Sequence, residues 1–119
     1  MPEQVGLPAA VEALSALAHG HRLAVFRLLV RAGAEGVAAG EIAREVGVLP
    51  STLSTHLNIL GHAGLVQSRR EGRSVIYSAD FKGMRDLLSF LVSDCCGGRP
   101  EICAPLAEIA EAAQCCPPR

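Results

Sequence analysis

The sequence contains no tryptophan, one tyrosine and three phenylalanines among its 119 residues. A hydrophobic core must therefore be built mainly from leucine, valine, isoleucine and alanine, which favours helices packed on helices. Half of the residues are nonetheless hydrophobic, so the chain can bury a core without disulfides. The length fits one compact domain and is too short for two. We expect that domain at residues 1–104, followed by a short helix and tail at residues 105–119.

Long apolar runs and recognisable targeting segments are also missing. The first ten residues contain neither a basic segment nor a continuous apolar one, which argues against a signal peptide. The apolar stretches 23–26 and 28–30 are separated by an arginine, long before the roughly 18 residues that a membrane-spanning helix needs. We therefore expect a cytoplasmic protein without a membrane partner.

Motifs typical of a thiol enzyme or a phosphate-binding enzyme are absent as well. The sequence has no Cys-x-x-Cys beside a βαβ pattern and no glycine-rich phosphate loop, and no histidine lies near the cysteines. A metalloid reductase or a similar thiol enzyme is thereby disfavoured. We expect no enzymatic activity.

Hydrophobic periodicity predicts a mainly α-helical fold with a β-hairpin. A helix over residues 8–18 begins at a proline and carries an apolar stripe that includes Val11 and Leu14. The helix over residues 21–31 is apolar nearly all round, which indicates a central position. Gly72 supplies the tight turn of the hairpin, and Asp80 is the expected N-cap of the helix that follows. Further helices are predicted over residues 39–46, 50–63, 80–94 and 105–114, and strands over residues 65–69 and 74–78.

Residues 39–63 have the pattern of a helix-turn-helix, in which the second helix enters the major groove of DNA. Ala43 allows the two helices to pack closely, and Gly47 four residues later permits the chain reversal. Leucines at helical spacing would face inward, leaving a face of short neutral donors and acceptors that suit base edges and phosphate oxygens. Because serine and threonine weaken helices, an exposed face built from them indicates a function. The candidate DNA-contacting residues are Ser51, Thr52, Ser54, Thr55, His56 and Asn58.

The distribution of charge points to the same region. The formal net charge is −1, yet residues 51–79 carry three arginines against Glu71 alone. A local excess of positive charge at a hairpin is suited to the DNA backbone or the minor groove. The candidate arginines are Arg69, Arg70 and Arg73.

The stretch LPSTLSTHLNILGHAGLVQSRREGRSVIYSAD resembles the core of the ArsR/SmtB family of metal-responsive winged helix-turn-helix repressors. The earlier ALAHGHRLAVFRLL resembles the first core helices of the same family, so that the similarity covers about residues 8–94. The resemblance implies a homodimer with the first and last long helices at its interface. It also implies repression at a near-palindromic operator and release of the DNA when metal binds.

Two positions depart from the family pattern. Asn58 stands where a basic residue is common, which removes one phosphate contact. Leu49 precedes Pro50 where a capping side chain would stabilise the start of the helix by about 1 kcal/mol. Both departures predict modest intrinsic affinity for DNA.

All five cysteines lie within the last 25 residues, which indicates metal or redox chemistry rather than a disulfide scaffold. Cys95 and Cys96 are adjacent and point about 100° apart on a helix, so both face one ion only if the chain leaves the helix. Gly97-Gly98 allows this, and Cys103 can then fold back over the pair. Three thiolates suit a thiophilic three-coordinate centre better than a closed zinc site with four ligands.

The resemblance also indicates which metal or metalloid is the inducer. No histidine follows His62, so the histidine-and-carboxylate zinc site often found on the last helix of the family cannot form. The helix at residues 39–46 lacks the Cys-x-Cys motif of many relatives. The remaining similarity is to arsenic-sensing members with a Cys-Cys pair and a third cysteine beyond the last helix. We therefore predict that Cys95, Cys96 and Cys103 bind As(III), or Sb(III), as the inducer.

Two alternatives for the cysteines remain open. Cys115 and Cys116 could add thiolates for a Cd, Pb or Zn sensor, deliver the ligand, or have no role. A redox-sensing repressor would instead oxidise Cys95 or Cys96 with Cys103.

Overall fold

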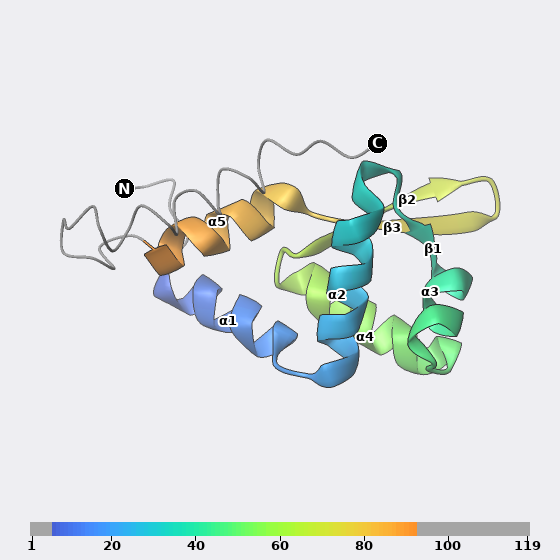
Figure 1. Ribbon diagram of the computed structural model, residues 1–119, viewed down its shortest axis with the longest axis horizontal. Coiled ribbons are helices and arrows are strands. Elements are labelled where there is room, and N and C mark those ends of the chain that lie inside the picture. The colour runs from blue at the N-terminus through green and yellow to red at the C-terminus, as the bar shows by residue number, and fades with distance from the viewer. Residues whose placement is uncertain (1–5, 93–119) are drawn as a thin grey trace.

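The computed structural model describes residues 6–92 and has the predicted winged helix-turn-helix order (Figure 1). The five cysteines, the helix predicted over residues 105–114 and the domain boundary predicted at residue 104 lie outside these residues. The helices are α1 (Leu7–Leu17), α2 (Gly20–Ala32), α3 (Ala39–Val46), α4 (Pro50–His62) and α5 (Phe81–Val92), with a 3-10 turn at Gly33–Glu35. The strands are β1 (Val37–Ala38), β2 (Val66–Glu71) and β3 (Ser74–Ala79).

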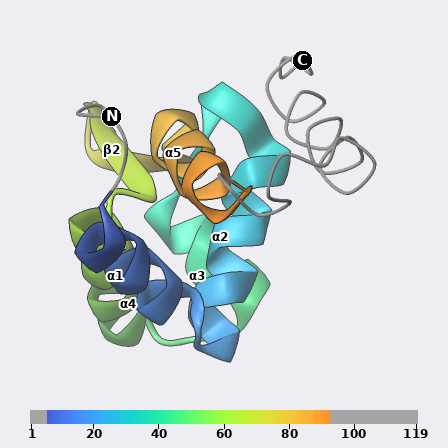
Figure 2. The ribbon, with the colours of Figure 1, turned by 90° about the vertical axis from the view of Figure 1, so that its left-hand side faces the viewer.

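Helix α2 occupies the centre of the molecule, as its nearly all-round apolar sequence predicts. It packs against α1, α3, α4 and β3, and Figures 1 and 2 show the other helices arranged around it. Its Val25 and Leu29 have no exposed surface. Apart from Phe26, the rest of the buried core is aliphatic, in keeping with the shortage of aromatic residues. The other fully buried large side chains are Ile42, Leu53, Leu60 and Leu65.

The wing is a three-stranded antiparallel sheet in the order β1-β3-β2. Gly72, with φ +62°, forms the predicted turn between β2 and β3. Strand β1 was not predicted, because two residues are too short to show an alternating pattern. Its Val37 pairs with Tyr77 of β3. Gly36 permits this pairing, since its φ is +74° and a Cβ there would lie 2.5 Å from the carbonyl oxygen of Tyr77.

Helix α1 packs on the core through alanines rather than through its larger apolar side chains. Ala10, Ala13 and Ala16 are buried, whereas Val11 and Leu14 of the predicted stripe are 52% and 42% exposed. Small side chains allow α1 to approach α2 and α4 closely. The side chains of Leu7, Val11 and Leu14 consequently face away from the core.

Helix α5 begins as predicted, with the Asp80 carboxylate accepting a hydrogen bond from the Gly83 backbone N–H at 3.1 Å. Gly83 also packs directly on the carbonyl of Gly64, where a Cβ would clash. Leu87 inserts into the core, and α5 lies beside α1 (Figures 1 and 2). None of the helices within residues 6–92 is long and apolar enough to cross a membrane.

Candidate nucleic-acid interface

The turn between α3 and α4 has the geometry that its sequence predicts. Ala43 is buried where the two helices meet, and Gly47 adopts the left-handed conformation at φ +82°, ψ +39°. The backbone N–H groups of Gly47 and Val48 both donate to the Ala43 carbonyl, at 2.8 and 3.1 Å. The last turn of α3 is thus closed, and the chain reverses within three residues before α4 begins at Pro50.

Helix α4 separates an apolar face from a polar one. Leu53, Leu57 and Leu60 are buried, as predicted. The opposite face offers hydroxyl and amide groups that can each donate and accept hydrogen bonds. The helix start has no side-chain cap, because Leu49 occupies the N-cap position. The exposed polar residues of this face are Ser51, Thr52, Ser54, Thr55 and Asn58.

The prediction that His56 lies on this outer face is wrong. Its side chain is 7% exposed, because it follows Leu53 by three residues and therefore shares the inward side of α4. Its Nδ1 lies 3.4 Å from a terminal nitrogen of Arg22, whose Nε donates to the Ala16 carbonyl at 2.7 Å. Because an arginine N–H can only donate, His56 Nδ1 is the acceptor of this contact. His56 thus contacts Arg22 on the inward side of α4, away from the exposed serine and threonine face.

The surroundings of His56 favour its neutral form. Burial lowers its pKa below the ordinary value of 6.5, and the positive charges of His19, Arg22 and His21 lower the pKa further. Its ring centroid lies 4.8 Å from that of His19 and 5.8 Å from that of His21. A positively charged imidazole at this position would face the Arg22 guanidinium.

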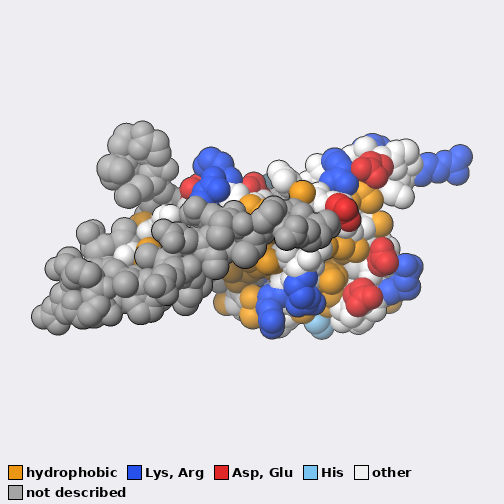
Figure 3. Space-filling model, turned by 45° about the horizontal axis from the view of Figure 1, so that its top comes forward, with side chains coloured by type: hydrophobic (Ala, Val, Ile, Leu, Met, Phe, Trp, Pro, Cys, Tyr) orange, Lys and Arg blue, Asp and Glu red, His pale blue; other side chains and the backbone are white. Residues whose placement is uncertain are grey.

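Among the three wing arginines, Arg69 is held by hydrogen bonds within the described residues, whereas Arg70 and Arg73 are not. Arg69 donates to the Glu71 carboxylate at 2.8 Å and to the carbonyls of Ala34 and Glu35 at 3.3 and 2.8 Å. It therefore fastens β2 to the segment before β1, and its contact with DNA stays a prediction. Arg70 and Arg73 are exposed, and neither forms a hydrogen bond or ion pair within residues 6–92. Basic side chains project at the wing end of the surface in Figure 3.

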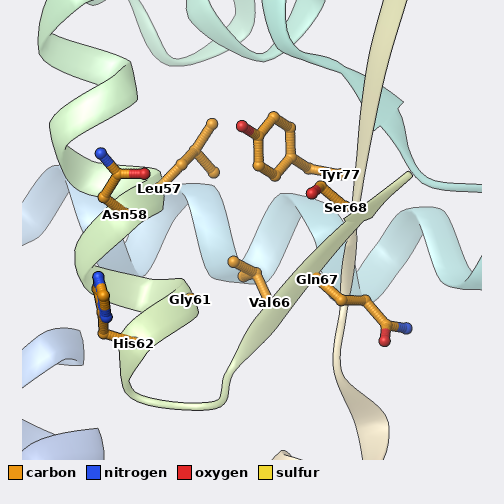
Figure 4. Close-up of a pocket in the computed structure, with 8 residues that line it drawn as sticks. All are labelled: Leu57, Asn58, Gly61, His62, Val66, Gln67, Ser68 and Tyr77. Atoms are coloured by element: carbon orange, nitrogen blue, oxygen red, sulfur yellow. The ribbon is translucent and has the colours of Figure 1, made fainter. Parts of the chain in front are cut away.

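A cavity of about 290 Å³ lies between α4 and the wing (Figure 4). Tyr77 extends from β3 toward Leu57 of α4, and Asn58 lines the same space. Gln67 and Ser68 supply further polar groups from β2. A largely polar groove therefore lies between α4 and the wing. Sequence reasoning did not predict this groove, because its residues come from three separate segments.

A second feature that sequence reasoning missed is the grouping of His19, His21 and His56. Their nearest ring nitrogens all lie within 4.8 Å of one another. The spacing of His56 after Leu53 could have indicated its inward position. Its meeting with the other two histidines depends on how α2 packs on α4, which local patterns do not reveal. The predicted thiol ligands Cys95, Cys96, Cys103, Cys115 and Cys116 lie outside the described residues.

Comparison with known proteins finds the same arrangement elsewhere. Residues 17–69 match a family model described as a helix-turn-helix domain. The chain is 29% identical over 93 residues to the HTH-type transcriptional regulator YgaV of Escherichia coli, covering 78% of this chain and 92% of YgaV. The residues that match the family model include α2, α3, α4 and the first part of the wing.

Two solved structures with a similar fold add to this comparison. One is the homodimeric winged helix-turn-helix DNA-binding domain of Mb0332 from Mycobacterium bovis, a possible ArsR-family transcriptional regulator. It is 30% identical, with 79% of this chain and 91% of that domain covered and a TM-score of 0.60. The other, a possible transcriptional regulator for arsenical resistance, is 29% identical, with coverage of 69% and 82% and a TM-score of 0.59.

Proposed function

Because this chain belongs to the winged helix-turn-helix transcriptional regulators of the ArsR type, we propose that it is an As(III)-responsive repressor. In this proposal the protein binds operator DNA as a homodimer. It leaves the operator when As(III), or Sb(III), binds the thiolates of Cys95, Cys96 and Cys103. The single observation that carries the DNA-binding part is the exposed serine- and threonine-rich face of α4 beside two free wing arginines.

The two groups of side chains have different tasks in DNA recognition. Helix α4 places hydroxyl and amide groups where a major groove presents base edges, and these contacts discriminate sequence. Arg70 and Arg73 lie at the wing, where their charges neutralise phosphates without reading sequence. Arg69 keeps the wing in place, so the distance between α4 and the two free arginines stays fixed.

An exposed apolar surface supports the homodimer. Leu7, Val11 and Leu14 on α1 are 65%, 52% and 42% exposed, and Leu91 on the neighbouring α5 is 45% exposed. Large exposed apolar side chains on neighbouring helices are typical of protein interfaces. The similar domain from Mycobacterium bovis is homodimeric. A twofold axis through this surface would place two copies of α4 for two operator half-sites.

The chemistry of the thiol groups supports As(III), or Sb(III), as the inducer. Cys95, Cys96 and Cys103 lie on either side of Gly97-Gly98 in the sequence, and their thiolates are soft donors that select thiophilic centres such as trivalent arsenic. The likeness to a possible regulator of arsenical resistance points in the same direction. Because the bound form requires thiolates, arsenite affinity should fall as the pH falls.

Release of DNA requires coupling between the thiol site and the recognition helices. The cysteines follow α5 in the sequence, and α5 packs beside α1, whose apolar face we assign to the dimer interface. Gathering the thiolates would shift this interface and change the spacing between the two copies of α4. A coupling free energy of about 1–3 kcal/mol corresponds to a roughly 5- to 150-fold loss of DNA affinity.

The test is a titration of the full-length dimer with arsenite while it is bound to a fluorescent operator selected from random-sequence DNA. We expect roughly a 5- to 150-fold loss of operator affinity for the wild type. The Cys95→Ser/Cys96→Ser/Cys103→Ser variant should keep its operator at the same arsenite concentration. Release from this triple variant at the wild-type arsenite level would contradict the site assignment.

Two controls separate the alternatives for the thiols. The Cys115→Ser/Cys116→Ser variant should respond to arsenite like the wild type, and X-ray absorption should count three sulfur ligands around arsenic. A count of four sulfurs around cadmium or lead, with release by those metals alone, would favour a sensor for them. Release by mild peroxide without metalloid would favour a redox sensor.

A further inference from the structure

We propose that His19, His21 and His56 form a binding site for a divalent transition metal, separate from the cysteines. The site would join the α1–α2 connection to the inward side of the recognition helix. Neutral imidazoles are preferred ligands of zinc, copper and nickel, whereas soft thiolates suit arsenic. The protein would thus contain two sites that differ in the softness of their donor atoms.

The geometry needs only a small contraction to form the site. The three ligand nitrogens lie within 4.8 Å of one another. Two nitrogens bound to one tetrahedral zinc at about 2.0–2.1 Å are about 3.3 Å apart. His19 and His21 are exposed and can rotate toward the ion, while the buried His56 serves as the fixed ligand. Three protein ligands leave a fourth position for water.

The hydrogen bonds of the free protein determine what the metal must displace. In neutral His56, Nδ1 accepts from Arg22, so the ring proton is on Nε2. A metal at Nδ1 takes the place of Arg22. A metal at Nε2 moves the proton to Nδ1, where it faces the Arg22 donor. Either route breaks the contact between Arg22 and His56 and therefore changes how α2 holds α4.

The same reasoning applies to His19, the N-cap of α2. Its Nδ1 accepts a hydrogen bond from the His21 backbone N–H at 3.2 Å. Coordination through either nitrogen of His19 replaces this cap. The bound metal then holds the start of α2 in its place, because His21 lies in the first turn of that helix.

The structure provides a place for the displaced arginine. A neighbouring cavity of about 320 Å³ is lined by Arg22 together with Glu12 and Ser15 of α1. The guanidinium can turn into this space toward the Glu12 carboxylate, which lowers its repulsion of the metal. Arg22 is thus a competitor of the metal, and removing its charge should strengthen metal binding.

The experiment uses the full-length protein with all five cysteines replaced by serine, so that thiolates cannot bind the metal. Zinc is titrated calorimetrically in a buffer that does not chelate it. We expect one zinc per protomer and a rise in melting temperature on the order of 10 °C at a zinc concentration 100-fold above Kd. Absence of zinc binding by this folded protein would overturn the proposal.

Variants in the same background test the ligand set. His21→Ala, at an exposed position, and His19→Asn, which retains a capping side chain, should each weaken zinc binding at least tenfold. Arg22→Gln should strengthen it. His62→Gln, at an exposed histidine of the same helix α4, should leave zinc affinity unchanged. Unchanged affinity in both His21→Ala and His19→Asn would overturn the assignment, and circular dichroism verifies that each variant is folded.

Discussion

Helix α1 buries Ala10, Ala13 and Ala16 and exposes leucine and valine, whereas α4 buries its leucines and exposes serine and threonine. The two helices pack against each other in the same domain, so the difference does not come from their distance to the core. An apolar outer face gains free energy by leaving water for a protein surface. A face of hydroxyl groups gains instead from a partner with many polar atoms, such as a DNA groove. Under the proposed function, a second copy of the chain covers α1 and a DNA duplex meets α4.

Charging the outer face of α1 should have the largest effect. The Val11→Asp/Leu14→Asp variant removes apolar side chains that contribute about 1.5–3 kcal/mol each when buried, and it places carboxylates in a twofold interface. We expect sedimentation at the monomer mass of 12.4 kDa and operator affinity lower by about 100-fold or more, because two linked half-site contacts become one.

The matched control is Ser15→Asp, which adds one carboxylate at an exposed position of α1 that is already polar. This variant should remain a dimer and bind DNA like the wild type. A Val11→Asp/Leu14→Asp variant that still sediments as a dimer would remove α1 from the interface.

Removing hydroxyl groups from the outer face of α4 should have the next largest effect. In Ser54→Ala/Thr55→Ala, the loss of two or more hydrogen bonds of about 0.5–1.5 kcal/mol each should weaken operator binding roughly 5- to 150-fold. The free energy of unfolding should stay the same or rise, since alanine is the better helix former. Fluorescence anisotropy and urea unfolding measure the two quantities.

Ser15→Ala on α1 is the control for that substitution. It removes the same kind of hydroxyl group from an exposed helix position outside the proposed DNA surface. Equal losses of DNA affinity in the control and in Ser54→Ala/Thr55→Ala would show that the face of α4 has no special role.

Substitution of two wing arginines should distinguish a side chain that contacts DNA from one that holds the wing in place. Arg70→Ala should weaken binding to all sequences similarly and reduce the slope of log affinity against log salt by about 2, because the dimer loses one phosphate contact from each protomer. Arg69→Ala should leave that slope nearly unchanged but speed amide hydrogen exchange in β2, because its bonds to the Ala34 and Glu35 carbonyls are lost. Identical salt slopes for Arg70→Ala and the wild type would remove Arg70 from the DNA surface.

We expect the smallest effect, on the pH dependence of stability, from His56 on the inward side of α4. Because the folded state lowers the pKa of His56, the unfolded chain binds more protons at this residue below about pH 6.5. The free energy of unfolding should therefore fall as the pH falls below that value, measured with a chelator present. His56→Gln should show a shallower pH dependence between pH 7 and 5. An equally steep dependence in the variant would assign the effect to other groups.

Local patterns were sufficient to predict much of this fold. The helix bounds follow from apolar spacing and from turn and capping residues such as Gly47, Gly72 and Asp80. The side of α1 that packs inward was not predictable. Alanine allows two helices to pack closely, but it is only weakly hydrophobic and so does not mark the buried side of a helix in the sequence. Strand β1 was too short to produce a pattern.

Within the candidate site, the position of a side chain was predictable where it depends on its own helix and was not predictable where it depends on a distant partner. Five of the six proposed contacts on α4 are exposed as expected, but His56 meets Arg22, which lies 34 residues earlier. Arg69 similarly binds carbonyls of residues 34 and 35. Neither partner could be identified from residues adjacent in sequence. The assignment of the cysteines to a metalloid site stays a prediction.

The most direct test of these opposite helix faces is the mass of the complex between the full-length protein and a selected operator duplex, measured by native mass spectrometry. The account predicts two protomers on each duplex for the wild type, and no stable complex for Val11→Asp/Leu14→Asp at the same concentrations. A single wild-type protomer on the duplex, or a complex that the α1 substitutions leave unchanged, would contradict it.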